Sequence, residues 1–345
     1  MLSSSIGARD LRLRFCASHA VALAVSLTLS SAAAEPVHIR FGWTNTPTTL
    51  APLLFHKTDN LRHYRKTYVV DLIRFAGSTP LLAALKSNQI DMGAVSFSNL
   101  GHAIVRQGVE EFRIVADGAQ GGVHGYSSVE YYVRNDSAIK SIADLKGKIV
   151  ASNARGGTSD FGLAAGLHRQ GFTEKLDYTL VHAPYSQLGN MLLDGKVDLV
   201  ALPAPFTYEP RFKANARILF TVNDVLGPTQ QLITASTKSF LDKNRAAVQD
   251  FFEDYLISLR WHLDPANRDE AIKRLASITN IPEKRFASWA FTKDSFYHDP
   301  QARPNLDALK ANLATMKDMG LLPVALDPAP YVDLSFLDEA ARRLK

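Results

Sequence analysis

A ten-residue pattern that occurs twice, 107 positions apart, constrains the fold of this chain more than any other feature. Segments 85–94 (LKSNQIDMGA) and 192–201 (LLDGKVDLVA) share a leucine, a turn residue, a β-branched residue, an aspartate and an alanine in register. Each copy has the pattern of a helix end, a turn and a short buried strand. A strand end before an apolar helix also occurs at the same offset upstream of both copies. The sequence therefore predicts two copies of one α/β unit.

The segment 148–171 (KIVASNARGGTSDFGLAAGLHRQG) indicates what such a unit can do. Its pattern predicts a strand, a glycine-rich and hydroxyl-bearing loop at 153–159, and then an apolar helix. Thr158 or Ser159 would cap that helix, and Arg155 stands beside it. The free N–H groups and the positive dipole end of the first turn favour a small anionic group. The alternative is an ordinary strand-to-helix turn whose glycines serve only the backbone geometry.

The order of strand, polar loop and helix start also recurs in the first part of the chain. Predicted strands lie at 37–43, 68–75 and 89–95, and predicted helices at 50–58, 81–88 and 100–107. Hydroxyl-rich loops join them. Such alternation with short connections predicts a parallel sheet covered by helices, in which ligands bind beyond the carboxyl ends of the strands.

The first 34 residues have the pattern of a secretory signal peptide. Three arginines precede the apolar run 17–29, and an A-x-A site at 32–34 precedes Glu35. We therefore expect an exported mature chain that starts at Glu35. The only cysteine, Cys16, lies within the signal, so the mature chain would have no disulfide and no lipid anchor on cysteine.

Removal of the signal also changes the charge of the chain. Three Arg and one Asp lie in the signal, so the mature chain carries 36 basic and 33 acidic residues, a net charge of +3. This small excess, without a basic stripe or interleaved aromatic residues, argues against a nucleic-acid partner. It is compatible with an anionic ligand and does not require one.

The arrangement of the two units predicts two lobes. The β-rich runs at 128–134 and 231–235 flank the second unit, and helical patterns dominate the rest of the chain. We expect the first lobe to comprise 35–133 and 233–345, and the second to comprise 134–232. The chain would then cross twice between the lobes, which is the usual hinge of a two-lobed clamp.

Motifs for common enzyme chemistries are absent from the sequence. It contains no G-x-S-x-G, H-E-x-x-H, P-loop or G-x-G-x-x-G motif, and its ten histidines show no metal-ligand spacing. Asp91 and Asp198 begin predicted strands, away from the ligand loops, so we expect structural roles for them. We therefore predict a non-enzyme without metal or cofactor. A Ser–His–Asp triad assembled from distant residues stays open as an alternative.

Several of these segments together resemble one known family. The pattern A-L-x-x-x-x-I-D-x-G-A at 84–94, the phrase SIADLKGK at 141–148 and G-x-V-D at 195–198 are similar to the periplasmic binding proteins of ABC transporters. Among these, the chain resembles the nitrate/sulfonate/taurine branch, called NMT1/SsuA-like. The resemblance implies an α/β, two-lobed fold of type II, each lobe a mostly parallel sheet flanked by helices. It also implies a monomeric receptor that captures a small anion by hinge closure and delivers it to the permease subunits of a transporter.

The same resemblance implies a set of ligand-binding residues in the cleft loops. The hydroxyl donors are Thr46, Ser78, Ser96 and Ser128; the backbone donors are Gly156, Gly157 and Thr158; the charge partner is Arg155; and the aromatic wall is Trp43, Phe97, Tyr126, Tyr185 and Phe206. These loops contain few basic residues, which disfavours nitrate and favours an organic sulfonate or carboxylate, aromatic or aliphatic. Taurine-like, nitrile-like and pyrimidine-like solutes also fit such loops. A periplasmic enzyme, or a receptor that serves a sensor, remains the alternative.

Overall fold

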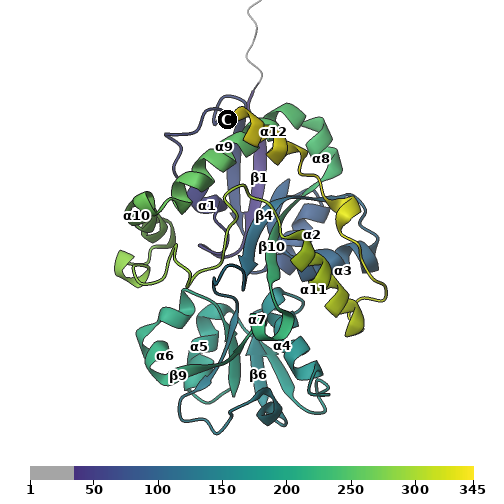
Figure 1. The fold of residues 1–345 in the computed structure, drawn as a ribbon, viewed down its shortest axis with the longest axis vertical. Coiled ribbons are helices and arrows are strands. Elements are labelled where there is room, and N and C mark those ends of the chain that lie inside the picture. The colour runs from purple at the N-terminus through teal and green to yellow at the C-terminus, as the bar shows by residue number, and fades with distance from the viewer. Residues whose placement is uncertain (1–34) are drawn as a thin grey trace, which may run out of the picture. The chain divides into compact units, whose positions relative to one another are not determined.

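The computed structural model describes residues 35–345, so the predicted signal peptide lies outside the described residues. Two five-stranded sheets with flanking helices form the fold of this part (Figure 1). Within 35–345, no helix combines the length and the apolar character that a membrane crossing requires. The two sheets with their flanking helices confirm the predicted α/β fold class.

The two sheets have the same strand order and the same strand directions. In each, the first three strands are parallel, and an antiparallel strand in the fourth position separates the third strand from the fifth. The first sheet is β2 (Tyr68–Arg74), β1 (Val37–Trp43), β3 (Met92–Ser96), β10 (Thr229–Thr237) and β4 (Phe112–Gly121). The second sheet is β7 (Thr179–His182), β6 (Ile149–Ser152), β8 (Leu199–Leu202), β5 (Glu130–Arg134) and β9 (Ala216–Thr221). The repeated pattern in the sequence therefore corresponds to a repeated topology.

Helices cover these sheets and form most of the tail. The helices of the first part are α1 (Ala51–Leu54), α2 (Ser78–Lys86) and α3 (Phe97–Gln107), and those of the second are η1 (Ile142–Leu145), α4 (Thr158–His168), α5 (Tyr185–Leu193), η2 (Phe206–Tyr208), α6 (Pro210–Asn215) and α7 (Val222–Leu226). The remaining helices are α8 (Lys238–Lys243), α9 (Arg245–Leu263), η3 (Pro265–Asn267), α10 (Arg268–Thr279), η4 (Glu283–Arg285), α11 (Leu306–Asp318), η5 (Ala329–Tyr331) and α12 (Ser335–Arg343). Figure 1 shows α12 beside α9.

Strand positions agree with the sequence prediction better than helix ends do. The strand predicted at 37–43 is β1. The helix predicted at 50–58 is only α1, because the backbone leaves helical geometry at Phe55 and a polar segment follows. The loop predicted at 96–99 is instead the first turn of α3, because the Ser96 hydroxyl accepts the Asn99 N–H at 3.3 Å and caps the helix.

Asp91 and Asp198, which occupy equivalent places in the repeated pattern, have equivalent structural roles. The Asp91 carboxylate accepts the backbone N–H of Arg40 in β1, and Asp198 accepts that of Ile149 at the start of β6, both at 2.9 Å. Each aspartate thus ties the strand it precedes to the parallel neighbour of that strand. These hydrogen bonds agree with the structural role expected for both residues.

The chain passes from the first sheet to the second at 122–129 and returns at 222–228. Both passages lie a few residues before the predicted lobe boundaries, which stay a prediction. The segment 293–297 contacts the first of these passages: Gln120 and Tyr297 exchange backbone hydrogen bonds of 2.8 and 2.9 Å, and Ser127 N–H donates to Lys293 O at 2.8 Å. The tail therefore contacts the end of β4 and the segment that leaves it.

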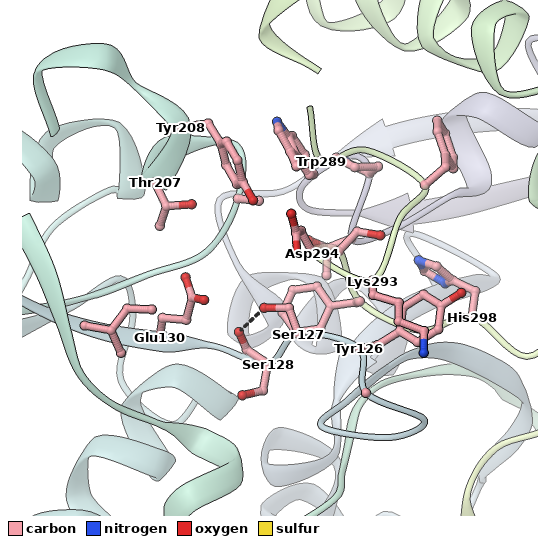
Figure 2. A pocket seen from close by; sticks show the side chains of 18 of the residues that line it. Tyr126, Ser127, Ser128, Glu130, Thr207, Tyr208, Trp289, Lys293, Asp294 and His298 are labelled. Carbon is pink, nitrogen blue, oxygen red and sulfur yellow. Dashed lines mark hydrogen bonds between the residues drawn. The ribbon is translucent and has the colours of Figure 1, made fainter. Parts of the chain in front are cut away.

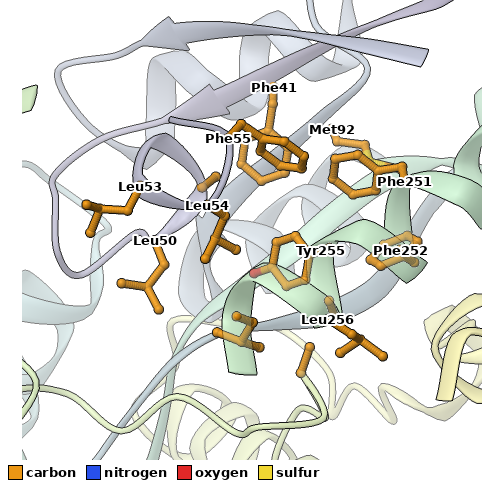
Figure 3. Packing of buried hydrophobic residues seen from close by; sticks show 14 of the residues in the cluster. Phe41, Leu50, Leu53, Leu54, Phe55, Met92, Phe251, Phe252, Tyr255 and Leu256 are labelled. Atoms are coloured by element: carbon orange, nitrogen blue, oxygen red, sulfur yellow. The ribbon is translucent and has the colours of Figure 1, made fainter. Parts of the chain in front are cut away.

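The main core lies between the first sheet and α9 (Figure 3). Apolar residues repeat along α9 at the spacing of one helix face. Among them, Phe251 places its ring 5.2 Å from that of Phe55 and 6.4 Å from that of Phe41. Burial of one such side chain stabilises the fold by about 2–3 kcal/mol. This core keeps the first sheet rigid beneath the loops that extend from its strand ends.

The burial of His262, near the end of α9, predicts that the unfolding free energy falls at acidic pH. Only 1% of its surface is exposed, and burial lowers its pKa to about 4 from an ordinary 6.5. Because the folded state then binds fewer protons than the unfolded state, this histidine makes stability fall as the pH falls from about 6.5 to about 4, by up to about 3 kcal/mol.

The measurement is urea denaturation of the wild type and His262→Gln between pH 4 and 8. We expect the difference in unfolding free energy between the two proteins to shrink as the pH falls. Comparison with the variant is needed because burial raises the pKa of Asp117 to about 7, which has the opposite effect on stability over the same pH range. A difference that is constant with pH would contradict the prediction.

Candidate functional site

A cavity with a volume of about 830 Å³ lies between the two sheets. Loops that follow β1, β2 and β3 form one side, and loops that follow β6, β7 and β8 form the other. Ile278, Thr279 and Ile281, at and just after the end of α10, and Gln231 of β10 also line the cavity. The cavity therefore lies at the carboxyl ends of the parallel strands of both sheets, where α/β folds usually bind ligands.

Helix N-termini surround this cavity. Residues of the first turns of α2, α4 and α5 line it, as do Ser96 and Asn99 at the start of α3. In the described part of the chain, no side chain caps α2, α4 or α5. Their first-turn N–H groups are not satisfied by a capping side chain, although Pro80 of α2 has no N–H and the Gln187 N–H of α5 donates to Pro184 O at 2.8 Å. The dipoles of the four helices add a positive potential without formal charge. The arrangement favours an acceptor-rich or anionic ligand.

Eight of the thirteen predicted site residues line this cavity. They are Trp43, Thr46, Ser78, Ser96, Gly157, Thr158, Tyr185 and Phe206. The loops that hold them are far apart in the sequence, and the repeated topology brings them together. Thr158 begins α4 and does not cap it: the cap position is Gly157, and the Thr158 hydroxyl donates to Gln231 O at 3.1 Å.

The structure places the other five residues elsewhere. Phe97 is 0% exposed and packs edge-on against Phe161 in the core, because α3 already begins at this residue. Tyr126 and Ser128 line a second cavity. Gly156 contributes its backbone to other contacts: its carbonyl accepts the Ser98 hydroxyl at 2.7 Å, and its N–H donates to a carboxylate.

Arg155, the fifth of these residues and the predicted charge partner, does not line the cavity and pairs with a carboxylate instead. Its guanidinium donates two hydrogen bonds, of 2.8 and 3.2 Å, to the Glu174 carboxylate, and its side chain is 63% exposed. These hydrogen bonds raise the pKa of Arg155 further. The two side chains neutralise each other, so Arg155 offers no charge to the cavity wall.

Two other basic side chains do line the cavity, and the sequence reasoning missed both. Arg74, at the end of β2, holds its guanidinium 5.6 Å from the centre of the Trp43 ring. His182, at the end of β7, has Nε2 2.8 Å from an Asp160 oxygen. Each is the last residue of a strand that leads into a predicted ligand loop. That position in the sequence could have identified both as candidate site residues.

The Asp160 carboxylate places a negative charge at the N-terminus of α4. One oxygen of its carboxylate accepts the Gly156 N–H at 2.8 Å, and the other contacts His182. The side chain is buried in the first turn of α4. The N-terminus of α4 therefore already has a carboxylate of its own, whereas in the described residues the starts of α2 and α5 have none.

An apolar wall faces these polar groups. The rings of Tyr185 and Phe206 stack at 5.7 Å, and Trp43, Phe75 and Phe296 complete the wall. The Tyr185 hydroxyl is 2.7 Å from that of Ser159, and burial raises the pKa of Tyr185 to about 12, so the phenol stays protonated at neutral pH. The cavity thus offers flat apolar surface beside hydrogen-bond donors.

The two sides touch each other beside the cavity. The Ser98 hydroxyl of α3 donates to Gly156 O at 2.7 Å, and the Thr79 hydroxyl donates to Arg155 O at 3.4 Å. Thr79 in turn accepts from the Asn99 amide at 3.0 Å. The loop predicted to bind ligand therefore also forms a contact between the two units.

Comparison with known proteins gives a family and a set of similar folds. The model of the NMT1-like family matches residues 32–276. No curated protein matches the chain in sequence. The alkanesulfonate-binding protein SsuA from Xanthomonas axonopodis pv. citri, bound to MOPS, is 20% identical with a TM-score of 0.66, covering 87% of this chain and 99% of that chain.

Two further structures are similar at lower identity. The periplasmic nitrate-binding protein NrtA from Synechocystis PCC 6803 is 15% identical with a TM-score of 0.70, and the alignment covers 90% of each chain. The desulfurization enzyme DSZB is 13% identical with a TM-score of 0.62, covering 90% of this chain and 100% of that chain. At such identities, the similarity shows that the fold is shared.

Proposed function

Because the chain belongs to the NMT1-like family, we propose that it is the periplasmic solute-binding receptor of an ABC importer and that the 830 Å³ cavity is its ligand site. The observation that carries the proposal is the convergence of four helix N-termini and an aromatic wall on one cavity between two equivalent sheets. Two of the similar structures are a sulfonate-binding and a nitrate-binding protein, which supports the same class.

The ligand that we propose is a small organic anion with an apolar part, a sulfonate or a carboxylate. Its oxygens would accept from the first-turn N–H groups of α2 and α5, with Arg74 and His182 on the same wall. Its apolar part would lie against Tyr185 and Phe206. A cavity of about 830 Å³ with this much aromatic surface suits such a solute better than nitrate.

Orphaned donors in the wall support a ligand that supplies acceptors. Within the described residues, Nε1 of Trp43 and Nδ2 of Asn45 are buried without a hydrogen-bond partner, and both residues line the cavity. A buried donor without a partner costs about 1–3 kcal/mol, so an acceptor oxygen placed against this wall would recover stability. An ammonium group or a hydrocarbon could not do so, because neither has an acceptor.

The transport cycle that we propose uses two lobes, 35–133 with 233–345 and 134–232. Ligand binding would stabilise the closed arrangement of these lobes, and the closed monomer would dock on the permease subunits. The contacts from Ser98 and Thr79 to the 155–156 backbone are the closing contacts in this proposal. The predicted signal peptide at 1–34 would deliver the chain to the periplasm.

A periplasmic enzyme is the second candidate, and one observation favours it. His182 is oriented by the Asp160 carboxylate and lies on the cavity wall, which is the arrangement of a general base. The fold is also shared with a desulfurization enzyme. Chromatography of a bound solute after long incubation separates the two candidates, since a receptor returns the solute unchanged.

A thermal-shift screen of residues 35–345 tests the receptor proposal. Methanesulfonate, benzenesulfonate, benzoate, nitrate and uracil would be compared, each at rising concentration. A ligand at 100 times its dissociation constant adds about 2.7 kcal/mol to the unfolding free energy, which is a readily measured shift. We expect benzenesulfonate or benzoate to raise the midpoint, and Phe206→Ala to weaken that ligand about tenfold through loss of the stacked ring.

Tyr185→Phe is the matched control, because it keeps the ring and removes only the hydroxyl that bonds to Ser159. We expect it to bind the aromatic anion more tightly than Phe206→Ala does. If no anion stabilises the wild type, or if nitrate alone does, the proposal of an organic anion is wrong.

A further inference from the structure

A second cavity, of about 410 Å³, lies beside the ligand cavity (Figure 2). The segment 125–132, the end of η2 and the tail segment 289–298 form its walls. It shares only Thr48 and Phe296 with the ligand cavity. Tyr126 and Ser128, which the sequence assigned to the ligand site, belong to this second cavity. Its chemistry differs from that of the first one.

A carboxylate without a cationic partner lies in its wall. Glu130 and Tyr132 are on the same face of β5, and the Tyr132 hydroxyl donates to the Glu130 carboxylate. Burial raises the pKa of Glu130, the Tyr132 hydrogen bond opposes this, and the nearby Asp294 carboxylate raises it further. Within 35–345, neither Glu130 nor Asp294 forms an ion pair. A partly buried carboxylate in this state favours a cation beside it.

The Thr207 hydroxyl is a second observation, independent of Glu130, that points to a ligand in this cavity. This residue is 6% exposed, and its Oγ1 makes no well-formed hydrogen bond among the described residues, although it lies close enough to the Tyr132 hydroxyl to oppose the rise of the Tyr132 pKa. It lies on the second cavity, while the preceding Phe206 lies on the first. In Figure 2 the Thr207 hydroxyl lies on the side of Tyr208 and Asp294. An added donor at this wall would satisfy the hydroxyl oxygen.

An aromatic surface continues the wall. The rings of Tyr208 and Trp289 stack at 5.2 Å, and Lys213 holds its ammonium 5.0 Å from the centre of the Tyr208 ring. The Tyr208 ring therefore already attracts one cation. Lys213 and Lys293 line the cavity, yet in the described residues neither pairs with Glu130 or Asp294. The acidic groups are thus available to a cation from outside.

From this cavity we propose a second binding site, which takes a small molecule through a primary ammonium group. The ammonium would donate to the Glu130 carboxylate and to the Thr207 oxygen, within reach of Asp294. The apolar part of the molecule would lie against Tyr208 and Trp289. The site is independent of the proposed anion site, because its polar residues are different ones and it offers the Glu130 and Asp294 carboxylates, whereas the first cavity offers helix N-termini.

Calorimetric titration of residues 35–345 with benzylamine at pH 8 tests the site, with benzyl alcohol as the uncharged comparison. We expect benzylamine to bind and benzyl alcohol to bind at least tenfold more weakly. Glu130→Gln should weaken benzylamine at least tenfold, because the amide keeps the acceptor for Tyr132 and removes the charge. Asp294→Asn, at an exposed residue, should weaken it by a smaller factor and serves if the first variant does not fold.

Ser78→Asp, in the first cavity, separates the two sites. Benzylamine affinity that is unchanged in Ser78→Asp and reduced in Glu130→Gln supports the second site. Absence of benzylamine binding to the wild type overturns it, as does equal binding of benzyl alcohol. Benzylamine binding that is strengthened by Ser78→Asp and unaffected by Glu130→Gln also overturns it, since the amine would then occupy the first cavity.

Discussion

Ser78→Asp is expected to weaken binding of an organic anion about 100-fold or more while leaving the fold intact. Ser78 is the first residue of α2 and lines the ligand cavity. A carboxylate there would face the anion at the helix start, and two unit charges about 5 Å apart repel by about 3 kcal/mol at an effective dielectric constant of 20. The measurement is the dissociation constant of the anion found in the thermal-shift screen, by calorimetry at low salt.

The fold itself should not suffer from this change. The Ser78 hydroxyl accepts the Ser96 N–H at 3.0 Å, which an Asp oxygen can also do. A negative charge in the first turn of a helix stabilises it by about 0.3–1 kcal/mol, so the unfolding midpoint should stay the same or rise. Ser78→Asn has nearly the shape of the aspartate without the charge and is the matched control. Equal losses of affinity in both variants would show that size, and not charge, is responsible.

Asp254→Ala is expected to lower the unfolding free energy by about 4 kcal/mol. Asp254 is 0% exposed on α9 and accepts four hydrogen bonds. Three come from the backbone N–H groups of residues 62–64 at 2.6, 2.9 and 3.0 Å, and one comes from the Tyr68 hydroxyl at 2.9 Å. Removal of the carboxylate leaves these donors without a partner, at a cost of about 1–3 kcal/mol for each that stays buried. Urea denaturation at pH 7 measures the loss.

Asp254→Asn provides the comparison for this prediction. The amide keeps one acceptor oxygen and turns an NH₂ group toward backbone donors. The unfolding free energy of Asp254→Asn should therefore lie between those of the wild type and Asp254→Ala. No residue of the segment 62–68 lines the ligand cavity, and anion affinity should therefore be retained wherever the variant is folded. A loss below about 1 kcal/mol in the alanine variant would mean that water replaces the carboxylate at little cost.

The sequence predicted the strands and the convergence of their loops, because both depend on local patterns. Period-two alternation located β1, and the repeated segment located β3 and β8. Parallel strands with short connections must place their carboxyl-end loops on one edge of a sheet. The assignment of individual residues such as Ser78 and Phe206 to a common site came from the resemblance to the binding-protein family, and the shared edge of the strands agrees with it.

Side-chain direction could not be predicted in the same way. Arg155 and Phe97 lie in the right loops, but Arg155 turns to Glu174, 19 positions away, and Phe97 turns into the core. The direction of each side chain depends on partners that only the tertiary fold brings near. Asp160 and His182 were missed for the same reason, since each is unremarkable in sequence until β7 sets the histidine against the start of α4.

The carboxylate of Asp160 has a consequence for discrimination among solutes. A monoanion in the cavity can direct its charge to the starts of α2 and α5, away from this buried group. A dianion such as sulfate or hydrogen phosphate must carry a second negative charge in the same enclosed space, where repulsion is poorly screened. Divalent inorganic oxyanions would then be excluded by their second charge, whatever their shape, whereas a monovalent organic anion would not.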